Sequence, residues 1–229
     1  MEIFLEKFLN ILINNFFLFN RFMNKIKFNY PNFEPSLGNL TAKFRDEYIN
    51  YYLNKGILNN MPFEKINSLV ASNDPKEPIY FWQLYSILGE EPIHILIKIF
   101  YENIFNDSHA PWFRDEFIDT GSIDFHVKGQ KKFWLDVMGG GEHYIGGEKR
   151  LHIKHKLVEN IMTKEGADRW MYNMEKTLNQ LNIYFIYFIK DKRILPCIDN
   201  FLKFFMEKYS IEFDFNLYEI LKNDKKSKL

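Results

Sequence analysis

Two histidines stand three residues apart in the stretch EKRLHIKH, residues 148–155. At this spacing His152 and His155 lie near one another on a helix, so both imidazoles could ligate one metal ion. One of them could instead bind a cofactor while the other faces water, or neither could be functional. The stretch lacks an HExxH pattern and a nearby trio of carboxylates, so it does not match a hydrolytic zinc site.

A second group of polar residues lies on the helix expected to begin near Ser122. Four residues at intervals of four, three and four share one face of it: His126, Gln130, Phe133 and Val137. An ordinary core helix would be apolar along this face, whereas this one begins with an imidazole and an amide. Either that end reaches solvent, or it lines a pocket with a dry end and a polar end, which suits a ligand that needs hydrogen-bond donors.

Two aromatic residues with a polar atom lie on helix faces that we expect to be buried. Tyr101 belongs to an apolar stripe at helical spacing that includes Ile97 and Ile104. Trp170 lies on the inner face of a helix expected after Thr163. Tyrosine and tryptophan usually find a hydrogen-bond partner when they are buried, so each is either a plain core residue or a donor that faces the same pocket.

The elements that must position these residues are predicted to be helices. They are expected over 41–54, near 62–70, from 90 to a break at Pro111, from 122 to the glycines at 139–141, over 163–181 and over 194–209. Only the stretch NIYFIYFI, residues 182–189, reads partly as a strand, and it suits a buried helix equally well. Because strands do not alternate with helices along the chain, we expect an all-α fold.

The composition excludes several classes of protein. The 229 residues include 30 basic and 30 acidic side chains, so the chain lacks the positive charge of a nucleic-acid-binding protein. Cys197 is the only cysteine, which rules out an intrachain disulfide and fits a reducing, cytoplasmic location. The apolar N-terminus, residues 1–27, is interrupted by Glu, Lys and Asn too often for a membrane span, and we do not expect an integral membrane segment.

The region from about 82 to 209 resembles the truncated haemoglobins, the two-over-two globins, and most of all their group II. The resemblance rests on the order of five segments: ILGEEPIHILIKIFYENIF with its Phe-Tyr pair, HAPWF at a corner, KKFWLDVMGGGEHY with a glycine motif before an aromatic residue, RLHIKH as Arg-Leu-x-x-x-His, and GADRWMYNM as Asp-x-Trp. The implied fold is an all-α, globin-like, truncated two-over-two helical sandwich. It would comprise a partly helical N-terminal extension, the globin domain and a C-terminal tail, over residues 1–78, 79–212 and 213–229.

The same resemblance implies a haem b cofactor with His155 as the proximal iron ligand, whereas His152 would not bind the iron. Tyr101 would point its hydroxyl at the bound ligand, and the Trp170 indole would reach the same site. The residues implied to contact haem or its ligand are His155, Tyr101, Phe100, Phe113, His126, Gln130, Phe133, Tyr144, Arg150 and Trp170.

One of these assignments carries an alternative, and another is extended to a neighbouring residue. The corner before Phe113 is about one residue shorter than in many relatives, so Phe117 is the alternative aromatic contact to the haem. Arg150 and Lys149 would meet the haem propionates, because arginine matches carboxylates geometrically.

The implied function is reversible binding of oxygen, nitric oxide or related diatomic ligands, with slow oxygen release because the distal side is unusually polar. The alternative is a haem-dependent nitric-oxide dioxygenase or peroxidase-like enzyme. Such an enzyme would need an external reductase, since the chain has no flavin or nicotinamide motif. A third reading is a helical interaction protein without haem, in which the aromatic residues are plain core.

Overall fold

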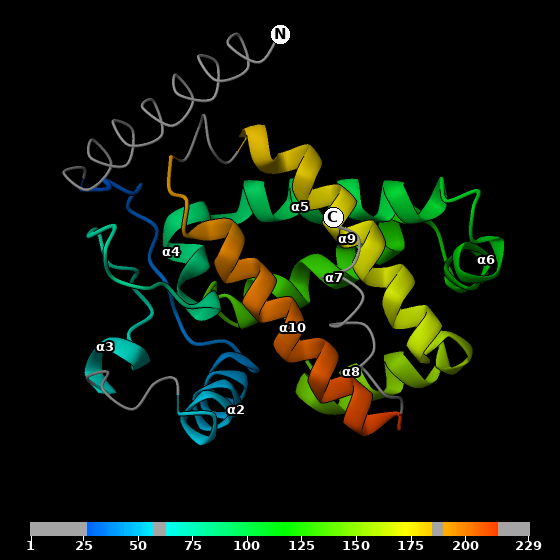
Figure 1. Ribbon diagram of the computed structural model, residues 1–229, viewed down its shortest axis with the longest axis horizontal. Coiled ribbons are helices and arrows are strands. Elements are labelled where there is room, and N and C mark those ends of the chain that lie inside the picture. The colour runs from blue at the N-terminus through cyan, green and yellow to red at the C-terminus, as the bar shows by residue number, and fades with distance from the viewer. Residues whose placement is uncertain (1–26, 57–62, 185–189, 215–229) are drawn as a thin grey trace, which may run out of the picture.

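The computed structural model describes residues 27–56, 63–184 and 190–214, and within these ranges every named element is a helix (Figure 1). In chain order they are α2 (Thr41–Asn54), α3 (Phe63–Asn67), η1 (Phe81–Gln83), α4 (Leu84–Leu88), α5 (Glu90–Phe105), α6 (Pro111–Thr120), α7 (Ile123–Val137), α8 (Gly147–Lys156), η2 (Glu159–Ile161), α9 (Lys164–Tyr184) and α10 (Ile194–Glu212). None of these helices is long and apolar enough to cross a membrane.

Most helix ends fall where the sequence predicts them. Ser122 caps α7 by accepting a hydrogen bond from the backbone N–H of Phe125 at 3.3 Å. The helix ends just before Gly139, whose φ of 87° suits glycine and whose missing side chain lets it approach the carbonyl of Trp82. The expected apolar stripe of α5 is buried, including Tyr101. The strand-like stretch is only partly described: α9 continues to Tyr184, and residues 185–189 lie outside the described ranges, as does the N-terminus up to residue 26.

Helix α6 adds one element to those predicted from the sequence. The expected break before Pro111 is present, since α5 ends at Phe105, but the sequence did not predict the helix α6 that Pro111 begins. Proline is tolerated there because the N–H that it lacks would have no partner in the first turn of a helix. The consequence matters for the site, because α6 buries the side chains of Phe113 and Phe117.

The layers are formed by two pairs of helices. Helix α5 packs against α7, and α9 packs against α10, while α5 and α9 join the two pairs (Figure 1). This arrangement is the all-α, globin-like sandwich that the sequence predicts. Helix α6 packs against α5, and α8 lies beside the C-terminal end of α10 (Figure 1).

Helix α2, which precedes the predicted globin domain, shares its hydrophobic core. The buried Phe44 ring meets the rings of Phe133 from α7 and Phe205 from α10, with centroids 6.2 and 4.9 Å apart. Edge-on aromatic pairs at these distances stabilise a core beyond the burial of their area. The domain boundary at residue 78 therefore stays a prediction. Helix α2 lies before this boundary and still packs into the same hydrophobic core.

A buried carboxylate at the end of α7 joins α2 to the turn that leads into α8. The side chain of Asp136 accepts hydrogen bonds from the backbone N–H groups of Leu40 at 2.7 Å, Tyr144 at 2.9 Å and His143 at 3.2 Å. Its backbone carbonyl accepts a bond from the Thr41 hydroxyl at 2.5 Å. Because Asp136 is fully buried, the buried N–H groups of Leu40 and Tyr144 would lose their partner without gaining water if the carboxylate were removed, whereas the N–H of His143 also donates to the carbonyl of Gly141 at 3.0 Å.

We predict that Asp136→Ala lowers the free energy of unfolding by about 2–6 kcal/mol, since each of the two stranded buried N–H groups costs roughly 1–3 kcal/mol. Urea denaturation followed by circular dichroism measures the change. The control is Asp46→Ala, which removes an exposed carboxylate whose ion-pair partner is Arg45 at 3.5 Å. This control should shift stability by no more than about 0.5 kcal/mol, and equal losses in both variants would contradict the prediction.

Candidate functional site

A cavity of about 750 Å³ lies among α5, α6, α7, α8, α9 and α10. It lies within the size range of cofactor pockets, and most of its lining is aromatic or aliphatic. The predicted site residues that line it are His155, Tyr101, Phe113, His126, Gln130, Phe133, Tyr144, Arg150 and Trp170. The structure therefore brings together side chains from five helices and one turn that are far apart in the sequence.

Phe100 is the predicted site residue that does not line the cavity. Its ring is fully buried and packs against the rings of Trp170 and Tyr101, with centroids 4.8 and 5.3 Å apart. It therefore supports the cavity wall from behind. Phe113 and its predicted alternative Phe117 both line the cavity, with ring centroids 5.1 Å apart, so the structure does not force a choice between them.

The imidazole of His155 is held in a largely apolar setting on the last turn of α8. Its ring meets the ring of Tyr209 from α10 edge-on, with centroids 4.3 Å apart. Its Nδ1 atom is buried and has no hydrogen-bond partner among the described residues. Burial lowers the pKa of His155 to about 4, because the charged form would lose its hydration. At neutral pH the ring is therefore uncharged and has a lone pair free for a metal.

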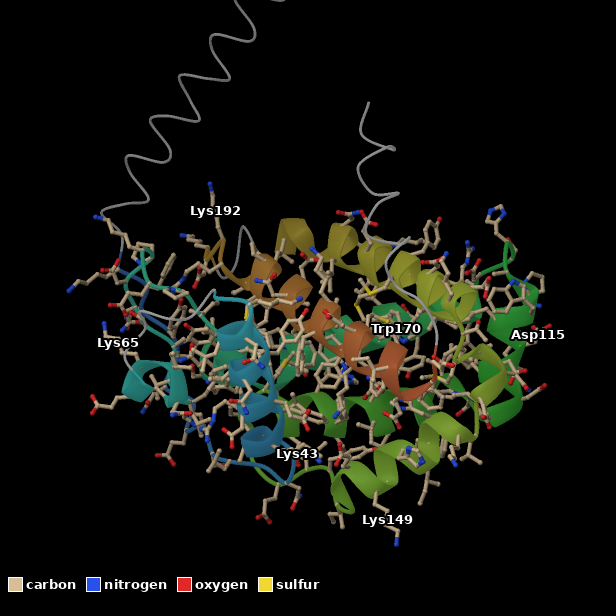
Figure 2. The ribbon with its side chains drawn as sticks, turned by 60° about the horizontal axis from the view of Figure 1, so that its bottom comes forward. Lys43, Lys65, Asp115, Lys149, Trp170 and Lys192 are labelled. Carbon is tan, nitrogen blue, oxygen red and sulfur yellow. The ribbon has the colours of Figure 1, made fainter. Side chains whose placement is uncertain are left out.

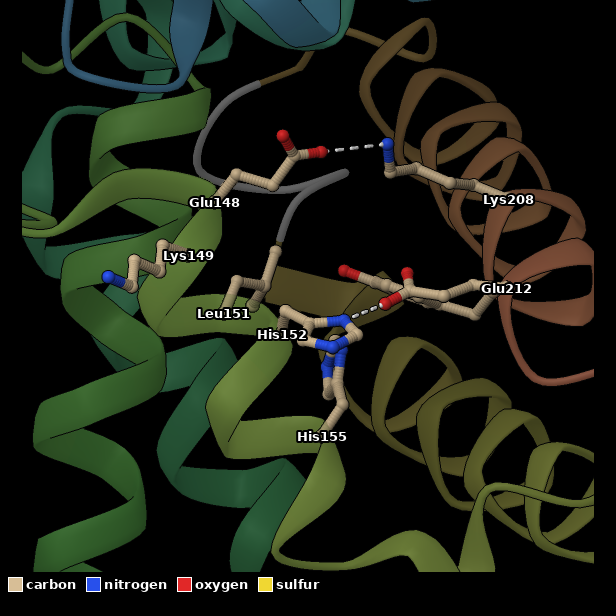
Figure 3. A pocket seen from close by; sticks show the side chains of 8 residues that line it. Glu148, Lys149, Leu151, His152, His155, Lys208 and Glu212 are labelled. Atoms are coloured by element: carbon tan, nitrogen blue, oxygen red, sulfur yellow. Dashed lines mark hydrogen bonds and ion pairs between the residues drawn. The ribbon is translucent and has the colours of Figure 1, made fainter.

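His152 lies in a different environment from its neighbour. It is exposed, and its Nδ1 lies 2.5 Å from Oε1 of Glu212 on α10 (Figure 3). It lines a separate hollow of about 400 Å³ on the far side of α8 and does not line the large cavity, whereas His155 borders both. In the part of the chain that the structure describes, no cluster of three histidine, cysteine or acidic side chains could hold a metal ion. The structure thus separates the two histidines and does not support a shared site.

The rings of Tyr101 and His126 stack, with centroids 5.1 Å apart and planes inclined by 23°. His126 Nε2 lies 2.8 Å from the carbonyl oxygen of Phe117. Because a carbonyl only accepts, Nε2 carries the proton and donates it there. Burial also lowers the pKa of His126, which favours the neutral ring. In this form the ring offers the cavity an acceptor at Nδ1, so the donor role expected for His126 would require its protonation.

Three donors in the cavity wall are unpaired. The side chains of Tyr101, Gln130 and Trp170 line the cavity and have no hydrogen-bond partner within the described ranges. Burial raises the pKa of Tyr101, so its hydroxyl keeps its proton at neutral pH. Tyr101 is buried whereas Trp170 and Gln130 are partly buried, and a buried tyrosine usually has a partner, so the free Tyr101 hydroxyl indicates a place for a ligand.

An ion pair fixes the position of Trp170 on α9. The neighbouring Arg169 binds both carboxylate oxygens of Asp107, which lies in the corner after α5, and its Nε contact is 2.6 Å. Asn173 donates to the same carboxylate at 3.0 Å. The Arg169 guanidinium lowers the pKa of Asp107 to about 2, so the pair stays charged at neutral pH. Bidentate pairs of this kind set orientation as well as energy, and this one holds α9 against the end of α5.

The charged residues that line the cavity are all basic. Arg150 lies with its guanidinium 5.0 Å from the centre of the Tyr144 ring and donates to the carbonyl of Ile145 at 3.1 Å. Lys149, which was expected beside it, projects from the outer edge of α8 and does not line the cavity (Figure 2). Three lysines that the sequence interpretation missed do line it: Lys128, Lys132 and Lys154.

The spacing of Lys154 could have identified it, since it follows Arg150 by four residues and so shares its face of α8. Among the described residues no carboxylate lines the cavity, although the whole chain has as many acidic as basic side chains. Such a cavity suits a flat, apolar molecule with negatively charged groups at one edge.

The residues present therefore fit a haem. The apolar lining matches a porphyrin, and the basic residues match its carboxylates. His155 provides an uncharged imidazole whose buried Nδ1 has no hydrogen-bond partner among the described residues. These features follow from the contacts of the side chains alone.

Comparison with known proteins gives the same indication. A family model described as bacterial-like globin matches residues 83–202, which is more than half of the chain and includes every helix from α4 to α9 and the first part of α10. No curated protein and no solved structure matches the chain. The matched region contains all the side chains that we predicted to contact haem. We conclude that the chain belongs to the bacterial-like globins.

Proposed function

We propose that this globin holds haem b in the large cavity, with His155 as the iron ligand, and reversibly binds oxygen and related diatomic ligands. The observation that carries the proposal is that one cavity brings together a neutral imidazole on α8, whose Nδ1 is buried, and three donors on α5, α7 and α9 that have no hydrogen-bond partner among the described residues. We further propose that the protein is a truncated globin like those of group II, in which residues 79–212 form the globin domain and residues 1–78 an extension.

His155 is suited to hold the cofactor through Nε2. Its Nδ1 is closed off from solvent, which leaves Nε2 as the nitrogen that we assign to the iron. The low pKa of the ring removes the competition between a proton and a metal for that lone pair at neutral pH. When bound, haem supplies an iron that coordinates a small ligand on the side away from this histidine.

The unpaired donors act on a ligand that gains negative charge when it binds. Tyr101 and Trp170 each offer one proton, and Gln130 offers its amide. A hydrogen bond of this kind contributes roughly 0.5–1.5 kcal/mol, and more when the acceptor is charged. Because about 1.4 kcal/mol corresponds to a factor of ten, two or three such bonds would slow ligand release by orders of magnitude. Slow release suits sensing, scavenging or redox chemistry better than oxygen carriage.

The basic residues of the cavity would bind the haem carboxylates. Arg150 and Lys154 lie four residues apart on α8, and Lys128 and Lys132 lie four residues apart on α7. Residues at this spacing share one face of a helix, so each helix presents two cations to the cavity. Their charge would fix the orientation of the cofactor and would keep its carboxylates out of the apolar part of the cavity.

We predict that His155→Ala abolishes histidine ligation of haem. Among the described residues, the other histidine that lines the cavity is His126, which lies on α7 and not on α8. The purified full chain, reconstituted with haem, is followed by its Soret absorption and by the spectrum of the reduced form. His152→Ala is the control, because His152 borders only the outer hollow. Retained ligation in His155→Ala with loss in His152→Ala would reverse the assignment.

We predict that Tyr101→Phe speeds oxygen dissociation by about five- to thirtyfold, which corresponds to the loss of one to two kcal/mol of hydrogen bonding. Stopped-flow displacement of oxygen measures the rate. The matched control is Tyr80→Phe, which removes another buried hydroxyl, one that has no partner among the described residues and lies away from the cavity. An unchanged rate in Tyr101→Phe would remove this hydroxyl from the ligand site.

We also predict that Trp170→Phe speeds oxygen dissociation, by about three- to tenfold, because it removes the indole N–H but keeps a ring to pack on Phe100. The same kinetic assay applies. Trp112→Phe serves as the control, since Trp112 is half-exposed on α6 and does not line the cavity. If both variants retain the wild-type rate, the role of Trp170 is limited to packing.

A further inference from the structure

The second nitrogen of His155 lacks the partner that a metal-bound histidine normally has. A ligating imidazole usually donates its other N–H to a carboxylate or a carbonyl, which fixes the ring and makes it a stronger ligand. His155 Nδ1 is buried and makes no such bond within the described ranges. A buried donor without an acceptor is costly, roughly 1–3 kcal/mol, so the surroundings of this atom should hold an acceptor that it can reach.

The hollow behind the ring contains two carboxylates, and they differ in their partners. Glu148 is held by two lysines, Lys43 and Lys208, the latter at 3.2 Å. Glu212 is the last residue of α10. Its Oε1 lies 2.5 Å from Nδ1 of His152, and it has no lysine or arginine partner among the described residues. Figure 3 shows Glu212 beside the two histidines, while Glu148 turns toward Lys208.

Glu212 and His155 line the same hollow, and the charge of Glu212 is close enough to influence the ring. Burial dominates the pKa of His155, and the charge of Glu212 is the next largest influence, raising that pKa against the effect of burial. A negative charge that stabilises the protonated ring also stabilises a polarised Nδ1–H bond. His152 binds one oxygen of the Glu212 carboxylate at the rim of the hollow and so holds that side chain in place.

We propose that Glu212 is a positioning residue for the haem site, whose carboxylate accepts a hydrogen bond from Nδ1 of His155 when that histidine binds the iron. The inference rests on the proposed role of His155 and adds to it a residue from α10. No bond between the two groups is present in the structure, but the hollow of about 400 Å³ leaves room for the carboxylate to turn toward the ring.

The consequence is chemical. Donation to a carboxylate places more electron density on Nε2, which strengthens the bond to iron and favours the oxidised metal. This would bias the protein away from simple oxygen binding and toward the redox alternative, haem-dependent turnover of peroxide or nitric oxide with electrons from a reductase. Axial-ligand strength is one of the main ways in which a protein selects between these uses of haem.

The test compares Glu212→Gln with Glu148→Gln in the full-length, haem-reconstituted protein. Each variant removes one negative charge from the same hollow, so a general effect of charge would appear in both. Two properties are measured: the iron–histidine stretching frequency of the ferrous form by resonance Raman spectroscopy, and the reduction potential by spectroelectrochemical titration. A packing contact alone would move neither.

We expect Glu212→Gln to lower the stretching frequency and to favour reduction by about tenfold, which is roughly 59 mV for one electron. Glu148→Gln should leave both values near wild type. The proposal is overturned if Glu212→Gln keeps the wild-type frequency, or if Glu148→Gln shifts it equally. If the wild-type protein has no iron–histidine band at all, the proposed function fails first and the inference about Glu212 fails with it.

Discussion

The buried carboxylate of Asp136 is the interaction on which the geometry of the site depends. It lies at the end of α7, the helix that carries His126, Gln130 and Phe133, and it binds the backbone of Tyr144 in the turn before α8. The same carboxylate binds the backbone at the start of α2. One side chain therefore fixes the angle between the helix that carries the polar face and the helix that carries His155.

The two sides of α8 provide different chemistry. Toward the cavity, aromatic and aliphatic side chains keep His155 neutral, and the unpaired groups there are proton donors from other helices. Away from the cavity, the hollow is lined by charged groups from α8 and α10, in which Glu212 pairs with His152. The ring of His155 lies between these two environments; under the proposed function the first would act on the bound ligand and the second on the bond to the iron. Ligand release and redox behaviour can then be altered by different residues.

Much of the fold could be predicted from the sequence, because helix signals are local. The serine cap of α7, the glycines that end it and the apolar stripe of α5 each depend on residues within a few positions of one another. The helix that was not predicted, α6, also has a local signal: Pro111 marks the break after α5, and the first turn of a helix tolerates proline. Residues 182–189 could not be decided, since a short apolar run suits a strand or a buried helix.

The site was predictable in its members but less so in its contacts. Helical spacing put His126 and Gln130 on one face, but it could not show that the proton of His126 is bound by the carbonyl of Phe117, nine residues earlier. Spacing alone left His152 and His155 as equal candidates for a metal. Their separation depends on α10, because Tyr209 covers His155 while Glu212 binds His152. Contacts between residues that are this far apart in the chain follow from helix packing, which a local pattern does not contain.

The most direct measurement is a titration of the purified full-length chain with haem, followed by visible absorption and by the spectrum of the reduced, ligand-free protein. One large cavity with His155 as the proposed ligand predicts one haem per chain and a spectrum typical of iron bound by one histidine. A chain that stays colourless, or that binds haem without saturation at one equivalent and without a histidine ligand, would contradict the assignment of the cavity as a haem site.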